Sequence, residues 1–163
     1  MRNHFMTLAA LLSFFVFSAC KNTQKASSSG AAGGEGLVTV MSVPSSVKAG
    51  SPVMLKFTVY NKSAKALQFC KWHTPFEGFM SSFLDIQSSN NTEVQYRGVM
   101  AKRIMPPPPA AYIKVAAGDS VSVDIDVLKG YNVTAPATYK ASYQASGMSG
   151  LEKVNEVTFT VTE

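Results

Sequence analysis

The chain has 163 residues, of which 46% are hydrophobic and 15% are charged, and its formal net charge is +5. A chain of this length accommodates one folded domain of ordinary size. Its basic residues are scattered apart from the adjacent pair Lys102-Arg103. The composition therefore excludes the clustered basic surface that nucleic-acid binding requires, and we expect no nucleic-acid partner.

The first 19 residues are predicted to be an export signal. Arg2 provides a short positive segment, and a nearly continuous apolar run follows over residues 5–17. This run is shorter than the ~20 residues of a membrane-spanning helix and has the length of the apolar part of a secretory signal. Two small residues then precede Cys20 in a pattern that resembles a bacterial lipobox, although Phe17 replaces the usual leucine. We expect residues 1–19 to be a lipoprotein signal peptide and Cys20 to carry the lipid.

The segment that follows Cys20 is typical of a flexible tether. Residues 21–36 are mostly Ser, Gly, Ala and Lys and show no apolar period. A lipid anchor needs such a spacer, whereas an ordinary signal peptide followed by an incidental cysteine does not. We therefore expect residues 20–36 to connect a membrane of the bacterial cell envelope, at the outer membrane or the periplasmic face, to a domain over residues 37–163. Lipidation of Cys20 would leave Cys70 without a disulfide partner, as a buried small hydrophobic residue.

Apolar and polar side chains alternate in several short segments of residues 37–163. A period of two predicts half-buried antiparallel strands. The predicted strands are residues 38–43, 53–60, 66–72, 83–87, 121–127, 139–143 and 157–162. No segment shows a convincing helical period. Seven short strands separated by turn residues predict an all-β fold, an immunoglobulin-like antiparallel β-sandwich of about seven strands.

Tyr139 is a candidate corner tyrosine. It begins a late predicted strand directly after the turn segment Ala135-Pro136. Many immunoglobulin-like domains enter a late strand through a tyrosine whose hydroxyl binds the backbone a few residues upstream. We expect Tyr139 to make this hydrogen bond.

Residues 98–112, which we call the arm, do not have the pattern of a strand. Four consecutive prolines, residues 106–109, lack the N–H groups that a central strand needs and favour the stiff, extended polyproline II conformation. The arm is predicted to be extended and to lead into this rigid spacer. Its prominent side chains are Met100, Lys102, Arg103, Ile104 and Met105.

The sequence lacks recognisable catalytic machinery. After removal of the signal peptide one histidine, His73, remains, and neither a Gly-x-Ser-x-Gly nor a His-Glu-x-x-His motif is present. We expect no enzymatic activity and no cofactor. Copper binding is a minor alternative, because methionine sulfur and imidazole are soft ligands. The possible donors are His73, Met80, Met100, Met105 and Met148, but they show no Met-x-Met or His-x-Met spacing.

One segment resembles a known family. Residues 70–78 read CKWHTPFEG and are followed by Tyr96-Arg97-Gly98, by Lys102-Arg103, by Tyr112-Ile113 and by the turn at residues 116–120. Together they resemble the N-terminal pro-domain of deuterolysin-like (aspzincin) metalloendopeptidases, over about residues 37–145. The resemblance implies a β-sandwich that assists the folding of a catalytic zinc domain and keeps it latent. Because zinc-ligating motifs are absent from this sequence, it implies a free-standing inhibitory or chaperoning module.

The motif Trp72-His73-Thr74-Pro75 allows two interpretations. In the first, His73 and Thr74 satisfy backbone groups and brace the arm. In the second, Trp72 and His73 belong to a contact surface beside the arm. The pair Lys102-Arg103 is equally open, as a protease contact or as a solvated charged pair.

These observations predict a lipid-anchored, non-catalytic protein that binds an exported metallopeptidase as an inhibitor or chaperone-like partner. A pre-ordered arm loses less entropy on binding than a flexible one. In this hypothesis Lys102 or Arg103 enters a specificity pocket of the peptidase, flanked by Met100, Ile104 and Met105. The alternative is an adhesive or envelope-interaction domain whose sheet face binds a protein or a glycan.

Overall fold

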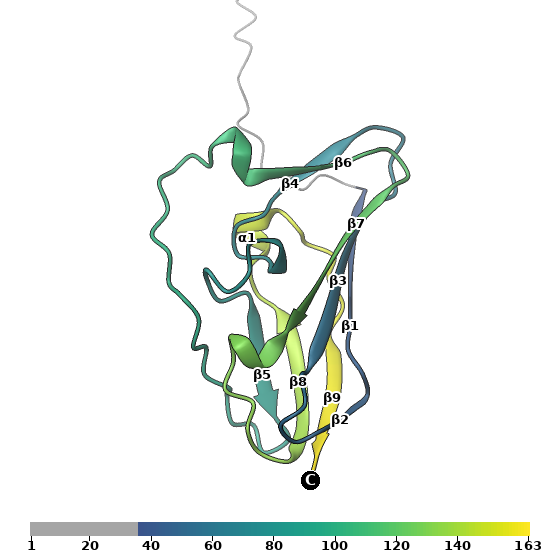
Figure 1. Cartoon of the computed structure of the whole chain (residues 1–163). Coiled ribbons are helices and arrows are strands. Elements are labelled where there is room, and N and C mark those ends of the chain that lie inside the picture. The colour runs from purple at the N-terminus through teal and green to yellow at the C-terminus, as the bar shows by residue number, and fades with distance from the viewer. Residues whose placement is uncertain (1–35) are drawn as a thin grey trace, which may run out of the picture.

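Residues 36–163 of the computed structural model form two facing β-sheets with a small third sheet at one end (Figure 1). The first sheet has the order β1-β3-β7, the second β2-β9-β8-β5, and the third consists of β4 and β6. The strands are β1 (Leu37–Ser42), β2 (Ser46–Lys48), β3 (Met54–Asn61), β4 (Leu67–Cys70), β5 (Leu84–Ser88), β6 (Tyr112–Val115), β7 (Ser120–Asp126), β8 (Ala137–Tyr143) and β9 (Val157–Thr162). The predicted signal peptide, Cys20 and all but the last residue of the predicted tether lie outside the described residues.

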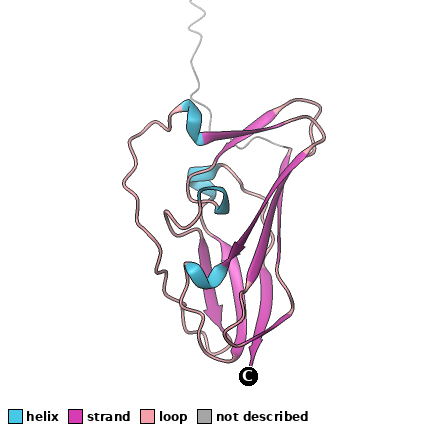
Figure 2. Cartoon of the chain, viewed as in Figure 1, coloured by secondary structure: helices cyan, strands magenta, loops and turns pink. Residues whose placement is uncertain are grey.

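Helical structure in residues 36–163 is confined to single turns in the connections, as Figure 2 shows. These are the 3-10 helices η1 (Pro75–Glu77), η2 (Pro109–Ala111) and η3 (Val127–Lys129) and the short α-helix α1 (Ser146–Ser149). Among these residues no helix is long and apolar enough to cross a membrane.

The all-β sandwich is confirmed, and all seven predicted strands are present. Two further strands, β2 and β6, were not predicted. β2 has three residues, of which Val47 alone is buried, so it is too short to show an alternating pattern. The pairing of β2 with β9 is parallel, which corrects the expectation of a wholly antiparallel fold.

The core lies between the two large sheets. Alternate residues of β9, Val157, Phe159 and Val161, are buried, and β3 contributes Leu55 and Phe57 from the facing sheet. Burial of each side chain of this size contributes about 1.5–3 kcal/mol. Cys70 is also buried, as predicted, and burial raises the pKa of its thiol.

Two tyrosines fix the connections around this core. The Tyr139 hydroxyl donates to the Ala135 carbonyl over 2.7 Å, which confirms the predicted corner tyrosine. The Tyr131 hydroxyl instead accepts two backbone N–H groups, from Phe83 at 3.0 Å and from Leu84 at 2.8 Å. Tyr131 is 2% exposed, and it joins the start of β5 to the segment after η3.

Replacement of these hydroxyls should have unequal effects. Tyr131→Phe should lower the free energy of unfolding by about 2–4 kcal/mol, because two buried amide donors lose their acceptor. Tyr139→Phe should lower it by about 1 kcal/mol, because the Ala135 carbonyl can bind water instead. Urea denaturation of both variants measures the difference. A Tyr131→Phe variant as stable as Tyr139→Phe would contradict this assignment.

Candidate functional site

The arm occupies the long connection between β5 and β6. In Figure 1 this connection follows one side of the molecule and ends at η2 and β6. Pro108 has φ −68° and ψ 160°, close to polyproline II, whereas Pro109 already begins η2. The predicted proline spacer is therefore extended only in part, because its last residue starts a 3-10 turn.

Backbone hydrogen bonds attach the first part of the arm to the domain. The Val99 and Ala101 N–H groups donate to the carbonyls of Phe79 and Met80, each over 2.9 Å. The Tyr96 hydroxyl lies 2.7 Å from the Phe79 carbonyl oxygen and 3.0 Å from that of Val99. Burial raises the pKa of Tyr96 to about 12, so this hydroxyl stays protonated at neutral pH.

The middle of the arm is held by Arg103. Its guanidinium Nη2 lies 2.5 Å from Glu77 Oε1, and the group also lies over the Trp72 ring, 4.8 Å from the ring centre. The Arg103 side chain is 19% exposed and that of Glu77 is 7% exposed. A charge-assisted hydrogen bond and a cation–π contact thus act on one largely buried side chain.

The motif at residues 70–78 forms the site that holds the Arg103 side chain. Thr74 is fully buried, donates to the Lys71 carbonyl over 2.6 Å and accepts from the Phe76 N–H over 3.2 Å. It thereby caps η1, which Pro75 begins, and the turn places Glu77 where it contacts Arg103, as Trp72 does. The His73 N–H donates to the same Glu77 oxygen over 3.1 Å, which fixes the carboxylate.

This geometry modifies the bracing interpretation of the motif. The side chains that brace the arm are Trp72 and Glu77, whereas Thr74 and Pro75 shape the turn. His73 contributes backbone groups, since its carbonyl also accepts from the Tyr143 hydroxyl over 3.1 Å. Glu77 is not among the site residues predicted from the sequence. It is the one acidic residue of the motif, and this is the sequence feature that indicates an arginine partner.

The outer side of the arm is apolar. Seven large hydrophobic side chains of residues 36–163 are exposed. Four of these belong to the arm, and a fifth, Met80, lies beside the arm. Their exposed fractions are Met80 39%, Val99 55%, Met100 72%, Ile104 87% and Met105 62%. Concentration of exposed apolar side chains on one segment of a domain is typical of an interaction surface.

The two basic residues of the arm differ. Lys102 is exposed, whereas Arg103 is engaged with Glu77, so the interpretation of a solvated charged pair is wrong for Arg103. To enter a peptidase pocket, Arg103 would have to leave Glu77 and Trp72. A direct contact by Lys102, Met100, Ile104 or Met105 requires no such rearrangement and stays a prediction.

The possible copper donors lie in different surroundings. Met100 and Met105 are exposed on the arm, whereas Met148 packs against the small cluster of Cys70, Trp72 and Ala111. Within residues 36–163 no group of three or more His, Cys, Asp or Glu side chains is placed to hold a metal ion.

The two facing sheets and the corner tyrosine define an immunoglobulin-like sandwich domain, and the long connection between β5 and β6 adds a braced surface arm. A family model described as an immunoglobulin-like domain matches residues 41–150, more than half of the chain. The chain belongs to this family.

A curated relative is an "Uncharacterized secreted protein" of Arthroderma benhamiae, 26% identical over 113 residues. That alignment covers 68% of this chain, and the chain spans 58% of the length of the relative. These two matches give no support to the resemblance to metalloendopeptidase pro-domains, which rests on the motif at residues 70–78 and the shorter segments that follow it.

Loss of the Arg103 anchor should loosen the arm. Glu77→Gln removes the ionic partner and keeps the shape of the side chain, and loss of a charge-assisted hydrogen bond of this kind costs ~1.5–3 kcal/mol. Hydrogen exchange at the Val99 and Ala101 amides should therefore accelerate by about tenfold or more. Lys102→Ala, an exposed neighbour, is the control and should leave these rates unchanged. Unaltered exchange in Glu77→Gln would show that Arg103 does not hold the arm.

Proposed function

We propose that this chain is a non-catalytic protein-interaction domain that binds its partner through the outer side of the arm. The observation that carries the proposal is the concentration of exposed apolar side chains on a segment that the domain itself holds in place. Apolar anchors on an ordered segment are the features that give protein interfaces most of their binding energy.

The chemistry of the arm indicates the kind of surface it binds. Met100 and Met105 are flexible thioethers that adapt to irregular apolar pockets, and Ile104 is the most exposed side chain of the group. Lys102 adds one positive charge beside them. The complementary surface is an apolar groove with an acidic group at its edge.

We further propose that the partner is an exported metallopeptidase, which the chain inhibits or assists as a chaperone. The support is the resemblance of CKWHTPFEG to aspzincin pro-domains, because this motif builds the turn that holds Arg103 and hence the arm. An extended segment ending in prolines can lie in a substrate groove and resist cleavage. The relative described as secreted supports export of this chain as well.

Inhibition assays with matched variants test this proposal. Residues 21–163 should slow at least one aspzincin-type peptidase. Met105→Glu should weaken the inhibition by about tenfold or more, because a charge would have to be buried at the interface. Met54→Glu is the matched control, since Met54 is 43% exposed and lies on β3 rather than on the arm.

Changes to the basic pair should act by two routes. Lys102→Ala should weaken inhibition by loss of a direct contact, and Arg103→Ala by release of the arm. Absence of inhibition and of binding across a panel of exported metallopeptidases would refute the peptidase assignment. Equal loss in the Met105 and Met54 variants would refute the arm as the contact surface.

Lipidation of Cys20 is the proposed route to the membrane. When the full chain is made in bacteria with labelled palmitate, the label should enter the protein and be lost in Cys20→Ser. Cys70→Ser is the control and should keep the label, because Cys70 is buried in the folded domain. Labelling of the Cys20→Ser variant, or an unlabelled native chain, would contradict the anchor.

A further inference from the structure

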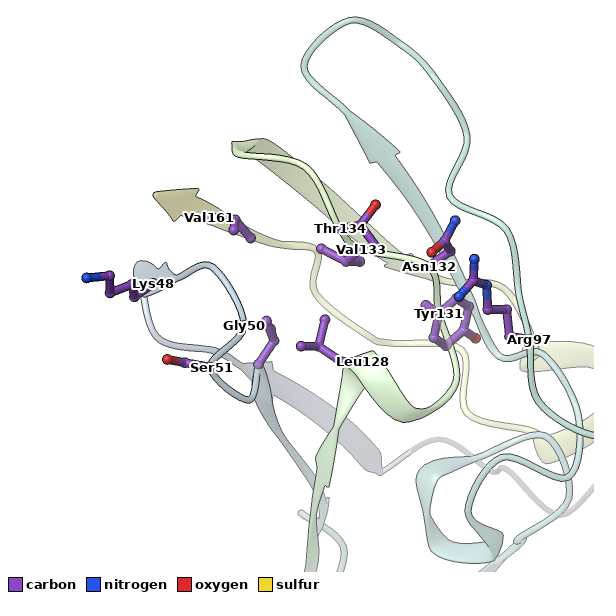
Figure 3. Close-up of a pocket in the computed structure, with 11 residues that line it drawn as sticks. Lys48, Gly50, Ser51, Arg97, Leu128, Tyr131, Asn132, Val133, Thr134 and Val161 are labelled. Atoms are coloured by element: carbon purple, nitrogen blue, oxygen red, sulfur yellow. The ribbon is translucent and has the colours of Figure 1, made fainter. Parts of the chain in front are cut away.

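A cavity of about 260 Å³ lies between the turn that precedes β3, the helix η3 and the segment that leads to β8 (Figure 3). Its lining includes no residue of the arm, so it is separate from the proposed contact surface. The apolar part of the wall is formed by Val53, Leu128, Tyr131, Val133 and Val161.

The charged groups of the lining are all positive. Arg97 and Lys48 belong to it, and none of its residues is acidic. Arg97 is exposed and forms no ion pair with any residue of the described range 36–163. An unpaired guanidinium at the edge of an apolar cavity is suited to a carboxylate, which it can bind through two parallel hydrogen bonds.

Asn132 belongs to the same lining and carries an acceptor without a partner among the described residues. Its Oδ1 atom is buried and receives no hydrogen bond from residues 36–163. A buried acceptor without a donor is costly, so such atoms commonly mark the place of a missing partner. The chemical group that satisfies it is an N–H or O–H donor.

Backbone pairing brings Arg97 and Asn132 together. The Arg97 N–H donates to the Gly130 carbonyl over 2.7 Å, and the Asn132 N–H donates to the Gln95 carbonyl over 2.9 Å. Residues 95–97 and 130–132 therefore run antiparallel, and the side chains of Arg97 and Asn132 share one face of the pair. Figure 3 shows both side chains at the same end of the cavity, with Val133 and Leu128 further along it.

The cavity is too small for a large ligand. Pockets for drug-sized molecules hold ~300–1,000 Å³, so this volume corresponds to one apolar side chain with its backbone groups. The ligand must combine an apolar body, a hydrogen-bond donor and a carboxylate close to that donor. An acylated α-amino acid has these three features on adjacent atoms.

We propose that the cavity binds an N-acylated apolar amino acid, the chemistry shared by the C-terminal residue of a peptide and by a free acyl amino acid. Its carboxylate binds Arg97, its amide N–H donates to Asn132 Oδ1, and its side chain packs among Val53, Val133 and Val161. This site is independent of the partner proposed for the arm.

Titration of the isotope-labelled chain, followed by amide NMR, tests the proposal. N-acetyl-leucine, and a short peptide ending in leucine with a free carboxylate, should each cause saturable shifts at Arg97, Leu128 and Val133. The corresponding amides, N-acetyl-leucinamide and the amidated peptide, should bind at least about tenfold more weakly, because they lack the charge that Arg97 recognises. Tighter binding of the peptide identifies a peptide terminus as the ligand, and equal binding identifies the small acyl amino acid.

Variants then locate the contact. Arg97→Gln should weaken binding of N-acetyl-leucine by about tenfold or more. Lys114→Gln is the matched control, because Lys114 is an exposed residue of β6 outside the cavity lining, and it should leave binding unchanged. Equal binding of the carboxylate and amide forms, or no saturable shift with either carboxylate, would overturn the proposal. The comparison of ligands uses the unaltered chain, so it holds even if a variant fails to fold.

Discussion

The contact of Arg103 with Glu77 and Trp72 is the interaction on which the arrangement of the candidate contact surface depends. It places a charged side chain of the arm against the domain, largely out of water. A largely buried ion pair contributes little net stability by itself, but loss of one partner leaves an unpaired charge. The pair therefore selects one position of the arm, because in other positions the charge of Arg103 or Glu77 would be exposed or would be left buried without its partner.

This constraint also decides which side chains face outward. With Arg103 turned toward the domain, the neighbouring Lys102 and Ile104 are exposed, and Met100 and Met105 extend the apolar surface on either side. The hydrophobic side chains are thus held outward by the arginine, against the tendency of such residues to bury. This arrangement, in which the domain holds an apolar segment in water, is the reason we propose that the arm is the segment that binds a partner.

Much of the fold could be predicted from the sequence, because a two-residue period and short polar turns specify half-buried strands. The period of β9 is an example, and the turn before Tyr139 was enough to predict its hydrogen bond. The strand β2 escaped prediction, since three residues carry no period and its parallel pairing is set by tertiary packing. The link from Arg103 to Glu77 spans 26 residues and depends on the Thr74 cap, and the buried Asn132 acceptor has no sequence signal.

We infer that the domain holds the arm in order before any partner binds. Backbone ¹⁵N relaxation of the free chain measures this directly at residues 99–105. We expect order parameters near those of the strands, about 0.85, at Val99, Ala101 and Arg103. Values below about 0.6 across the arm would contradict it, because an arm that moves freely on this timescale is not held by Arg103.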